Sequence, residues 1–193
     1  MANWFIVHPV ISGIVTTLLM WIDWLLTVAQ EQERSTHYSA HYESYPVNTI
    51  EGNVAVREGV SGQKILYSRH IIAALIIGAG IGYLITWFHD PWNILFLGYV
   101  WGLFLLVITQ HLSNLLGYKA GQKGITGKIR MHQRTGYLTQ SGRYFSLSVL
   151  LLVLSILSGS LFLYGVTIGG FTSALRQLLW MRKVPEIKPD EVS

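Results

Sequence analysis

The chain has 193 residues, a length that suits one domain, and 51% of them are hydrophobic whereas only 12% are charged. Soluble domains carry about 25% charged residues, so this composition excludes a disordered chain, a coiled coil and a nucleic-acid-binding domain, and it favours a membrane protein. The formal net charge is +4 and there is no cysteine, which excludes disulfides, thiolate metal sites and cysteine nucleophiles.

Four runs of the chain are long and apolar enough to cross a bilayer, which takes about 20 mostly apolar residues in a helix. We expect spanning helices over about residues 4–28, 70–88, 92–116 and 144–165. The first run carries a single charge, Asp23, and it has neither the basic start nor the small-residue cleavage site of a signal peptide. The pattern predicts an all-α polytopic membrane protein with four antiparallel transmembrane helices.

The segments that follow these helices differ in length and character. Only His89-Asp90-Pro91 separates the second run from the third, so those two helices are expected to be antiparallel neighbours. Residues 29–69 and 117–143 are long and polar, and we expect them to form two loops. After the fourth helix, residues 171–183 have the pattern of an amphipathic interfacial helix, which would end a single domain of residues 1–183.

Basic residues indicate on which side of the membrane the loops lie. The two long loops hold ten of the fourteen Lys and Arg residues, and loops rich in these residues stay in the cytoplasm. We therefore expect both loops in the cytoplasm and both termini outside, including a flexible tail over 184–193. The second loop, 117–143, has six basic residues and no acidic one, so it is expected to attract anionic lipids. No motif indicates nucleic acid.

Small residues recur every four positions on two of the helices. Small side chains at that spacing let helix backbones approach closely within a membrane. We therefore expect them to lie at helix–helix contacts inside one bundle; the alternatives are a contact between two copies of the chain and a groove for a lipid or cofactor. The residues are Ala74, Gly78 and Gly82 on the second helix, and Gly98 and Gly102 on the third.

Polar residues gather near the cytoplasmic ends of the expected helices. Asp23 and Thr27 are four residues apart on the first helix, and His111 and Asn114 are three apart on the third, so each pair shares a helix face. Ionisable groups inside a membrane are costly and usually mark functional sites. With His70 at the start of the second helix, these residues form our candidate polar cluster. The alternatives are an Asp23 that snorkels or is capped by Thr27, and histidines that simply lie at the membrane boundary.

Histidines suggest two further kinds of site. His37 and His41 are four residues apart and would share a divalent metal on a helix. A b-type haem between His70 and either His111 or His132 is a second alternative, because paired histidines hold haem in some four-helix bundles. Against haem, these histidines lie at the helix edges. Neither a Walker A motif nor a GxSxG motif occurs, so we name no catalytic residue.

The run Asp23-Trp24-Leu25-Leu26-Thr27, followed across a loop by Glu51-Gly52-Asn53 and a glycine-rich helix, resembles a group of small four-helix prokaryotic membrane proteins. Those proteins have a D-x-x-x-T … E-x-N-P pattern, and Val54 stands here where the pattern has proline. The resemblance extends to the end of the second helix. It implies a four-helix membrane fold without an assigned activity, and it adds Glu51 and Asn53 to Asp23 as candidates for a cation or polar-ligand site.

These features favour a non-enzymatic membrane protein whose cytoplasmic-side polar cluster binds or passes a small cation or polar ligand. A redox subunit with bis-histidine haem is one alternative. Another is a structural subunit, in which the glycine faces and the basic loop dock a partner in a homo-oligomer or a larger membrane complex.

Overall fold

The computed structural model describes residues 2–41, 54–122, 124, 126–128 and 131–185, and all regular secondary structure within them is helical. A π-helical turn, Arg34–Tyr38, and a 3-10 turn, Ser39–His41, prolong the second helix. The prediction of an all-α protein is confirmed for this part of the chain. The α-helices are α1 (Ala2–Val7), α2 (Pro9–Glu33), α3 (Val54–Ser61), α4 (Ser68–Trp87), α5 (Trp92–Gly121), α6 (Gln133–Ser158) and α7 (Leu161–Arg182).

Four helices are long and apolar enough to cross a membrane, as the sequence predicts: α2 with its extension, α4, α5 and α6. The first of them begins at Pro9, because the non-helical backbone of His8 separates α1 from α2. The extended α2 and α5 have 30 residues each, or about 45 Å at 1.5 Å per residue. Since a hydrocarbon core is about 30 Å thick, both helices are long enough to continue beyond it.

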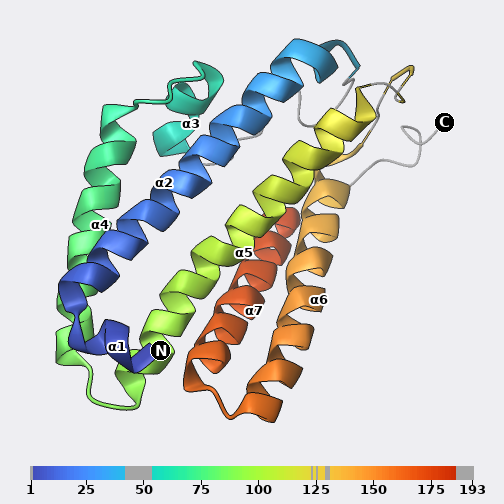
Figure 1. Cartoon of the computed structure of the whole chain (residues 1–193). Helices are drawn as coiled ribbons and strands as arrows, with labels where there is room; N and C mark the ends of the chain where they lie inside the picture. Colours follow the sequence, from blue (N-terminus) through green and yellow to red (C-terminus); the bar gives the residue numbers. More distant parts are fainter. Residues whose placement is uncertain (1, 42–53, 123, 125, 129–130, 186–193) are drawn as a thin grey trace.

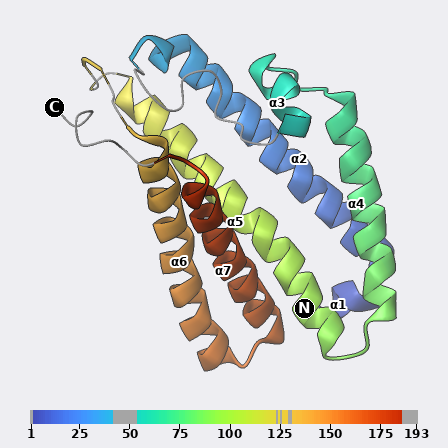
Figure 2. The same ribbon diagram turned by 180° about the vertical axis from the view of Figure 1, so that it is seen from behind.

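The long helices follow one another in the order α4, α2, α5, α7, α6 (Figure 1). α2 packs against α4 on one side and against α5 on the other, and α7 packs against both α5 and α6. Seen from behind, α4 and α5 again lie on either side of α2 above the turn that joins them (Figure 2). The bundle is therefore an open row of helices, with α5 near its middle.

A turn at Gly159 and Ser160 divides the last apolar stretch into two helices. Gly159 has a left-handed backbone (φ +62°), the usual C-terminal cap of a helix, and the Ser160 hydroxyl caps α7 by accepting from the backbone N–H of Leu163. The expected continuous helix over 144–165 is therefore wrong, because this helix starts at Gln133 and ends at Ser158. The turn is hard to predict because it contains no charge and is flanked by apolar runs.

α7 returns along α6 inside the bundle. Its 22 residues would measure about 33 Å, long enough to cross a membrane, although α7 is not among the four helices that have the hydropathy of a membrane span. Ser173, Ala174 and Gln177 are buried, so the expected interfacial helix over 171–183 is wrong; these residues are the second half of α7. As a result α1 and the C-terminal end of α7 lie near opposite ends of the bundle (Figure 1), and not at one end as the expected topology requires.

Much of the surface of the bundle is apolar, and small and polar residues lie beside apolar ones at its helix contacts, unlike in a soluble protein. In α6 the buried residues are Ser141, Tyr144, Ser148 and Ser155, whereas leucine, valine and isoleucine on the same helix are exposed. Large exposed apolar surfaces mark contact with membranes or partners. This pattern agrees with the four membrane-spanning helices.

The five small residues that we singled out all lie at helix–helix contacts within the chain. Ala74 is fully buried and its carbonyl accepts from Thr17 Oγ1 at 3.2 Å, and Gly78 and Gly82 face α2. Gly98 and Gly102 face α7: a Cβ at Gly102 would lie 2.6 Å from the Cα of Val166. Close approach thus holds α2 against α4 and α5 against α7.

Candidate functional site

Polar residues from α5, α6 and α7 lie at a common level of the bundle. Residues 98, 102 and 106 of α5 contact residues 162, 166 and 170 of α7, so the two helices run parallel with a constant register. One helical turn further along, the same register places Gln110 of α5 at the level of Ala174 of α7. In the α6–α7 hairpin, Arg143 and Arg176 are equally far from the turn at Gly159 and Ser160. We call the level that Gln110, Arg143 and Arg176 share the polar layer.

The centre of the candidate site is His111 on α5, which contacts three side chains of α2. Its Nε2 lies 3.2 Å from Asp23 Oδ1 and 3.2 Å from Thr27 Oγ1. Its Nδ1 lies 2.6 Å from Gln30 Nε2. The structure thus brings together Asp23, Thr27 and His111 of the expected cluster, because positions 23, 27 and 30 share one face of α2 and that face packs on α5.

The neighbouring groups define which atoms carry hydrogens. The Gln30 amide donates to His111 Nδ1 and to the carbonyl of Leu26 at 3.3 Å, so Nδ1 is an acceptor and Nε2 carries the proton. The Thr27 hydroxyl donates to the carbonyl of Asp23 at 2.9 Å, which leaves its oxygen as an acceptor for Nε2–H. These hydrogen bonds assign the Nε2–H tautomer to His111.

The carboxylate of Asp23 is incompletely satisfied. Its Oδ1 is shielded from solvent and accepts no well-aligned hydrogen bond, although His111 Nε2 is only 3.2 Å away. The two side chains are about one-fifth to one-quarter exposed, at 18% for His111 and 26% for Asp23. A shielded carboxylate oxygen without a donor is costly, and it is free to accept a proton or to bind a cation.

His70 lies against α2 but takes no part in this contact. Its Nε2 donates to the carbonyl of Met20 at 3.2 Å, and its ring stacks on Trp24 at a centroid distance of 4.5 Å. Trp24 also stacks on Tyr67, and its indole donates to the carbonyl of Ile65 at 3.0 Å. His70 therefore belongs to an aromatic stack that holds the start of α4 against α2.

Asn114 likewise faces away from His111. Its Oδ1 accepts from Gln110 Nε2 at 2.9 Å and from Arg143 Nη1 at 3.1 Å. These bonds connect α5 with α6, whereas His111, one turn earlier, connects α5 with α2. The expected cluster is thus divided between two sides of α5.

The loop candidates do not complete a metal site. Glu51 and Asn53 lie outside the described residues. His37 Nδ1 is 3.0 Å from Glu33 Oε1, whereas His41 Nδ1 is 2.6 Å from the carbonyl of Gly127, so the two histidines have different partners. Within the part of the chain that the structure describes, no group of three or more His, Cys, Asp or Glu side chains is arranged to hold a metal ion.

The histidines also do not fit a bis-histidine haem. Such a site needs two imidazole nitrogens that point at one iron. Nε2 of His70 is bonded to Met20, both nitrogens of His111 have partners on α2, and His132 caps α6 by accepting from the backbone N–H of Arg134 at 3.2 Å. We therefore derive no chemistry from haem.

The structure contains a buried ion pair near the end of α2 that the sequence analysis did not include in the candidate site. Arg34 donates to Glu31 through Nη2 at 2.6 Å and Nε at 3.1 Å, and both side chains are 3% exposed. Beyond them the hydroxyl of buried Tyr38 donates to the carbonyl of Tyr118 on α5. The acid–base spacing of three is visible in the sequence, but we expected residues 29–69 to form a loop.

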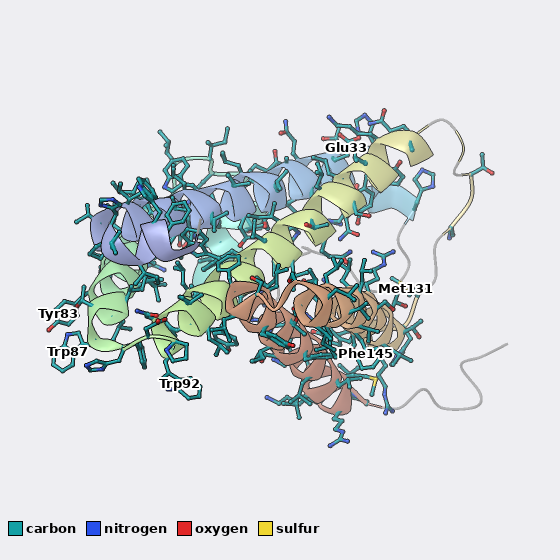
Figure 3. The ribbon with its side chains drawn as sticks, turned by 60° about the horizontal axis from the view of Figure 1, so that its bottom comes forward. Glu33, Tyr83, Trp87, Trp92, Met131 and Phe145 are labelled. Carbon is teal, nitrogen blue, oxygen red and sulfur yellow. The ribbon has the colours of Figure 1, made fainter. Side chains whose placement is uncertain are left out.

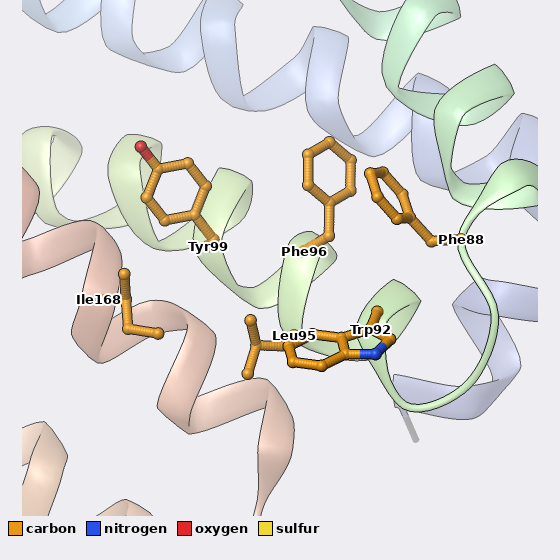
Figure 4. A pocket seen from close by; sticks show the side chains of 6 residues that line it. All are labelled: Phe88, Trp92, Leu95, Phe96, Tyr99 and Ile168. Carbon is orange, nitrogen blue, oxygen red and sulfur yellow. The ribbon is translucent and has the colours of Figure 1, made fainter.

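An apolar hollow lies at the opposite end of α5, near the α4–α5 turn (Figure 4). It has a volume of about 440 Å³ and is lined by Phe88, Trp92, Leu95, Phe96, Tyr99 and Ile168. None of the candidate polar residues lines it.

Comparisons with protein families, with curated proteins and with solved structures found no match to this chain. The resemblance to small four-helix membrane proteins therefore stays a prediction, and the functional argument depends on the geometry of the chain itself.

Proposed function

We propose that the protein is a non-enzymatic integral membrane protein in which Asp23 and His111 bind a small cation, the proton before all others. One observation carries the proposal: the shielded Oδ1 of Asp23 lacks an aligned donor while an imidazole nitrogen lies 3.2 Å away. Carboxylate–imidazole contacts between membrane helices are typical of proton relays.

The number of available ligand atoms favours the proton over a metal. A structural zinc site uses four protein ligands, and a Ca²⁺ site uses six or more oxygens. Here the described residues around His111 supply one carboxylate, one hydroxyl and one amide. A proton needs only one donor and one acceptor. Its binding to the imidazole would require the Gln30 amide to turn, so that its oxygen accepts from Nδ1.

We also propose that the end of the bundle with the long loops faces the cytoplasm. Residues 1–33, 70–118 and 144–175 contain no Lys or Arg. If α7 is a fifth crossing, Arg182 and Lys183 join the other basic residues at the loop end, and the positive-inside rule applies without exception. This revises the expected topology: the N-terminus stays outside, but the C-terminal end becomes cytoplasmic.

Aromatic residues support the opposite end as the outer membrane interface. Tyr83, Trp87 and Trp92 are grouped at the end of the bundle remote from Glu33 and Met131 (Figure 3), and they are 61–65% exposed. Tyrosine and tryptophan prefer the headgroup level of a bilayer.

Infrared difference spectroscopy on the reconstituted protein tests the cation site. Difference spectra between acidic and neutral samples should contain carboxylate and imidazole bands that disappear in Asp23→Asn and His111→Ala. Asp90→Asn is the control, because Asp90 is exposed at the other end of the bundle, and it should keep these bands. Parallel spectra with and without sodium or magnesium chloride separate a metal ion from a proton. If Asp23→Asn leaves every difference spectrum unchanged, the site binds no cation and the pair is structural.

A further inference from the structure

A polar groove runs between α5 and α6 at the level of the polar layer. Its volume is about 560 Å³, and its walls include Ser113 from α5 and Thr139, Arg143 and Ser146 from α6. Gly142 lines it too, and a Cβ at this glycine would meet no atom within 4 Å. The groove exists because α5 and α6 each pack on α7 but hardly on each other.

Arg143 brings a positive charge to this groove, and no acidic side chain of the described residues pairs with it. It donates to the neutral Asn114 side chain, which accepts one of the five guanidinium N–H groups. The sequence has no acidic residue between Asp90 and Glu186. The hydroxyls of Ser113, Thr139 and Ser146 make no hydrogen bond within the described residues. The groove therefore offers several donors, and no carboxylate among the residues that the structure describes forms an ion pair there.

Arg143 lies at the end of an apolar stretch of α6, from which its long side chain reaches toward the membrane boundary. From Arg143 to the end of α6 at Ser158 the helix rises about 22 Å, and the intervening residues carry no charge. Phe145, Val149 and Leu150 are exposed on this stretch, where they present an apolar surface to acyl chains. A guanidinium at the end of an apolar span of this length lies close to the membrane boundary.

We propose that this groove binds the phosphate of an anionic membrane phospholipid. The Arg143 guanidinium pairs with two phosphate oxygens, as its planar fork allows, and the hydroxyls of Thr139, Ser113 and Ser146 bind the remaining oxygens and the headgroup. The acyl chains follow the exposed side chains of α6. The basic loop was expected to attract anionic lipids, and this proposal gives that attraction a defined binding site. The lipid proposal does not depend on the cation site.

Lipid binding to the full-length protein tests the proposal. The purified protein is stripped of lipid and placed in phosphatidylcholine nanodiscs with increasing phosphatidylglycerol, and retained lipid is counted by native mass spectrometry. Arg143→Gln should weaken phosphatidylglycerol binding about tenfold, the loss expected for one charge-assisted contact. Arg176→Gln is the matched control: it removes the same charge at the same level, but its guanidinium lies over Trp180 on α7 and outside the groove.

A second variant tests the space in the groove without changing its charge. Gly142→Leu keeps Arg143 but fills the groove, and the open space at Gly142 means that the helix can accept it. It should cause the same loss, and it decides the question if Arg143→Gln fails to fold. Equal losses in Arg143→Gln and Arg176→Gln would show unspecific attraction and overturn the proposal. Binding of inorganic phosphate that depends on Arg143, without preference for phosphatidylglycerol, would also overturn it, in favour of a soluble phosphate ligand.

Discussion

The indole of Trp101 on α5 donates to the hydroxyl oxygen of Thr16 on α2 at 3.0 Å, and both residues are buried. The Thr16 hydroxyl in turn donates to the carbonyl of Ser12 at 2.8 Å, so it both donates and accepts a hydrogen bond. This contact lies on the same α2–α5 interface as Asp23 and His111, about two turns away along α2. Polar bonds thus occur at two levels of one interface.

Thr16→Val should lower the free energy of unfolding by about 1–2 kcal/mol, because it keeps the side-chain shape but leaves the buried Trp101 N–H without an acceptor. Thermal or denaturant unfolding in a fixed detergent measures the loss. Thr172→Val is the control: the Thr172 hydroxyl is exposed and bonds only the carbonyl of Ile168 on its own helix, so its removal should cost less than about 0.5 kcal/mol. Equal losses would mean that the Trp101 bond adds nothing.

Two glycines on α4 should respond in opposite ways to alanine. Gly78→Ala places a methyl group against Thr17 and 2.7 Å from the carbonyl oxygen of Gly13, so it should push α4 from α2 and destabilise the protein by about 1–3 kcal/mol. Gly80→Ala meets no atom within 4 Å and should stabilise α4 by about 0.5–1 kcal/mol through helix propensity. Melting temperatures of both variants check this. A stabilising Gly78→Ala would contradict the α2–α4 packing.

Asp23 and His111 should be energetically coupled. In a double-mutant cycle with Asp23→Asn and His111→Ala, the double variant should be less damaged than the sum of the two single losses, by about 0.5–3 kcal/mol. The same cycle with His70→Ala should be nearly additive, because His70 bonds Met20 and stacks on Trp24. Additivity in the first cycle would remove the basis of the cation site.

The absence of cysteine from the sequence allows topology to be tested with single cysteines. In intact cells an impermeant thiol reagent should label Asp90→Cys, but it should not label Gly124→Cys or Lys183→Cys. Permeabilised cells give the control, since all three should then react. Labelling of Lys183→Cys together with Asp90→Cys would mean that α7 does not cross the membrane and would restore the original placement of both termini outside.

Much of the bundle could be predicted from composition and spacing. Hydropathy predicts the four apolar helices. The short His89-Asp90-Pro91 link led us to expect α4 and α5 as antiparallel neighbours, and this is wrong beyond the turn, because α2 lies between the two helices. Spacings of four and three on α2 predict that Asp23, Thr27 and Gln30 share a face. Antiparallel order brings that face to the end of α5 that carries His111. These inferences need only helix geometry and chain direction.

Other parts of the site depend on how each helix is rotated about its own axis, which the sequence does not specify. The rotation of α5 decides that His111 faces α2 while Asn114 faces α6, and the rotation of α4 directs His70 to Trp24. The Gly159–Ser160 turn was missed because its neighbours on both sides are apolar, and hydropathy averages across it. Because the turn was missed, α7 was not recognised as a helix of the bundle, and the burial of its Ser173 and Gln177 was missed as well.

The order of the helices gives the α2–α5 interface a mechanical role. It is the main contact between two parts of the molecule, the α2–α4 pair and the α5–α6–α7 group, since α4 and α5 share few contacts. A charge gained or lost at Asp23 changes the attraction across this joint and not within either part. If Asp23 and His111 bind a cation as we propose, its binding at Asp23 Oδ1 acts on the contact between these two groups of helices.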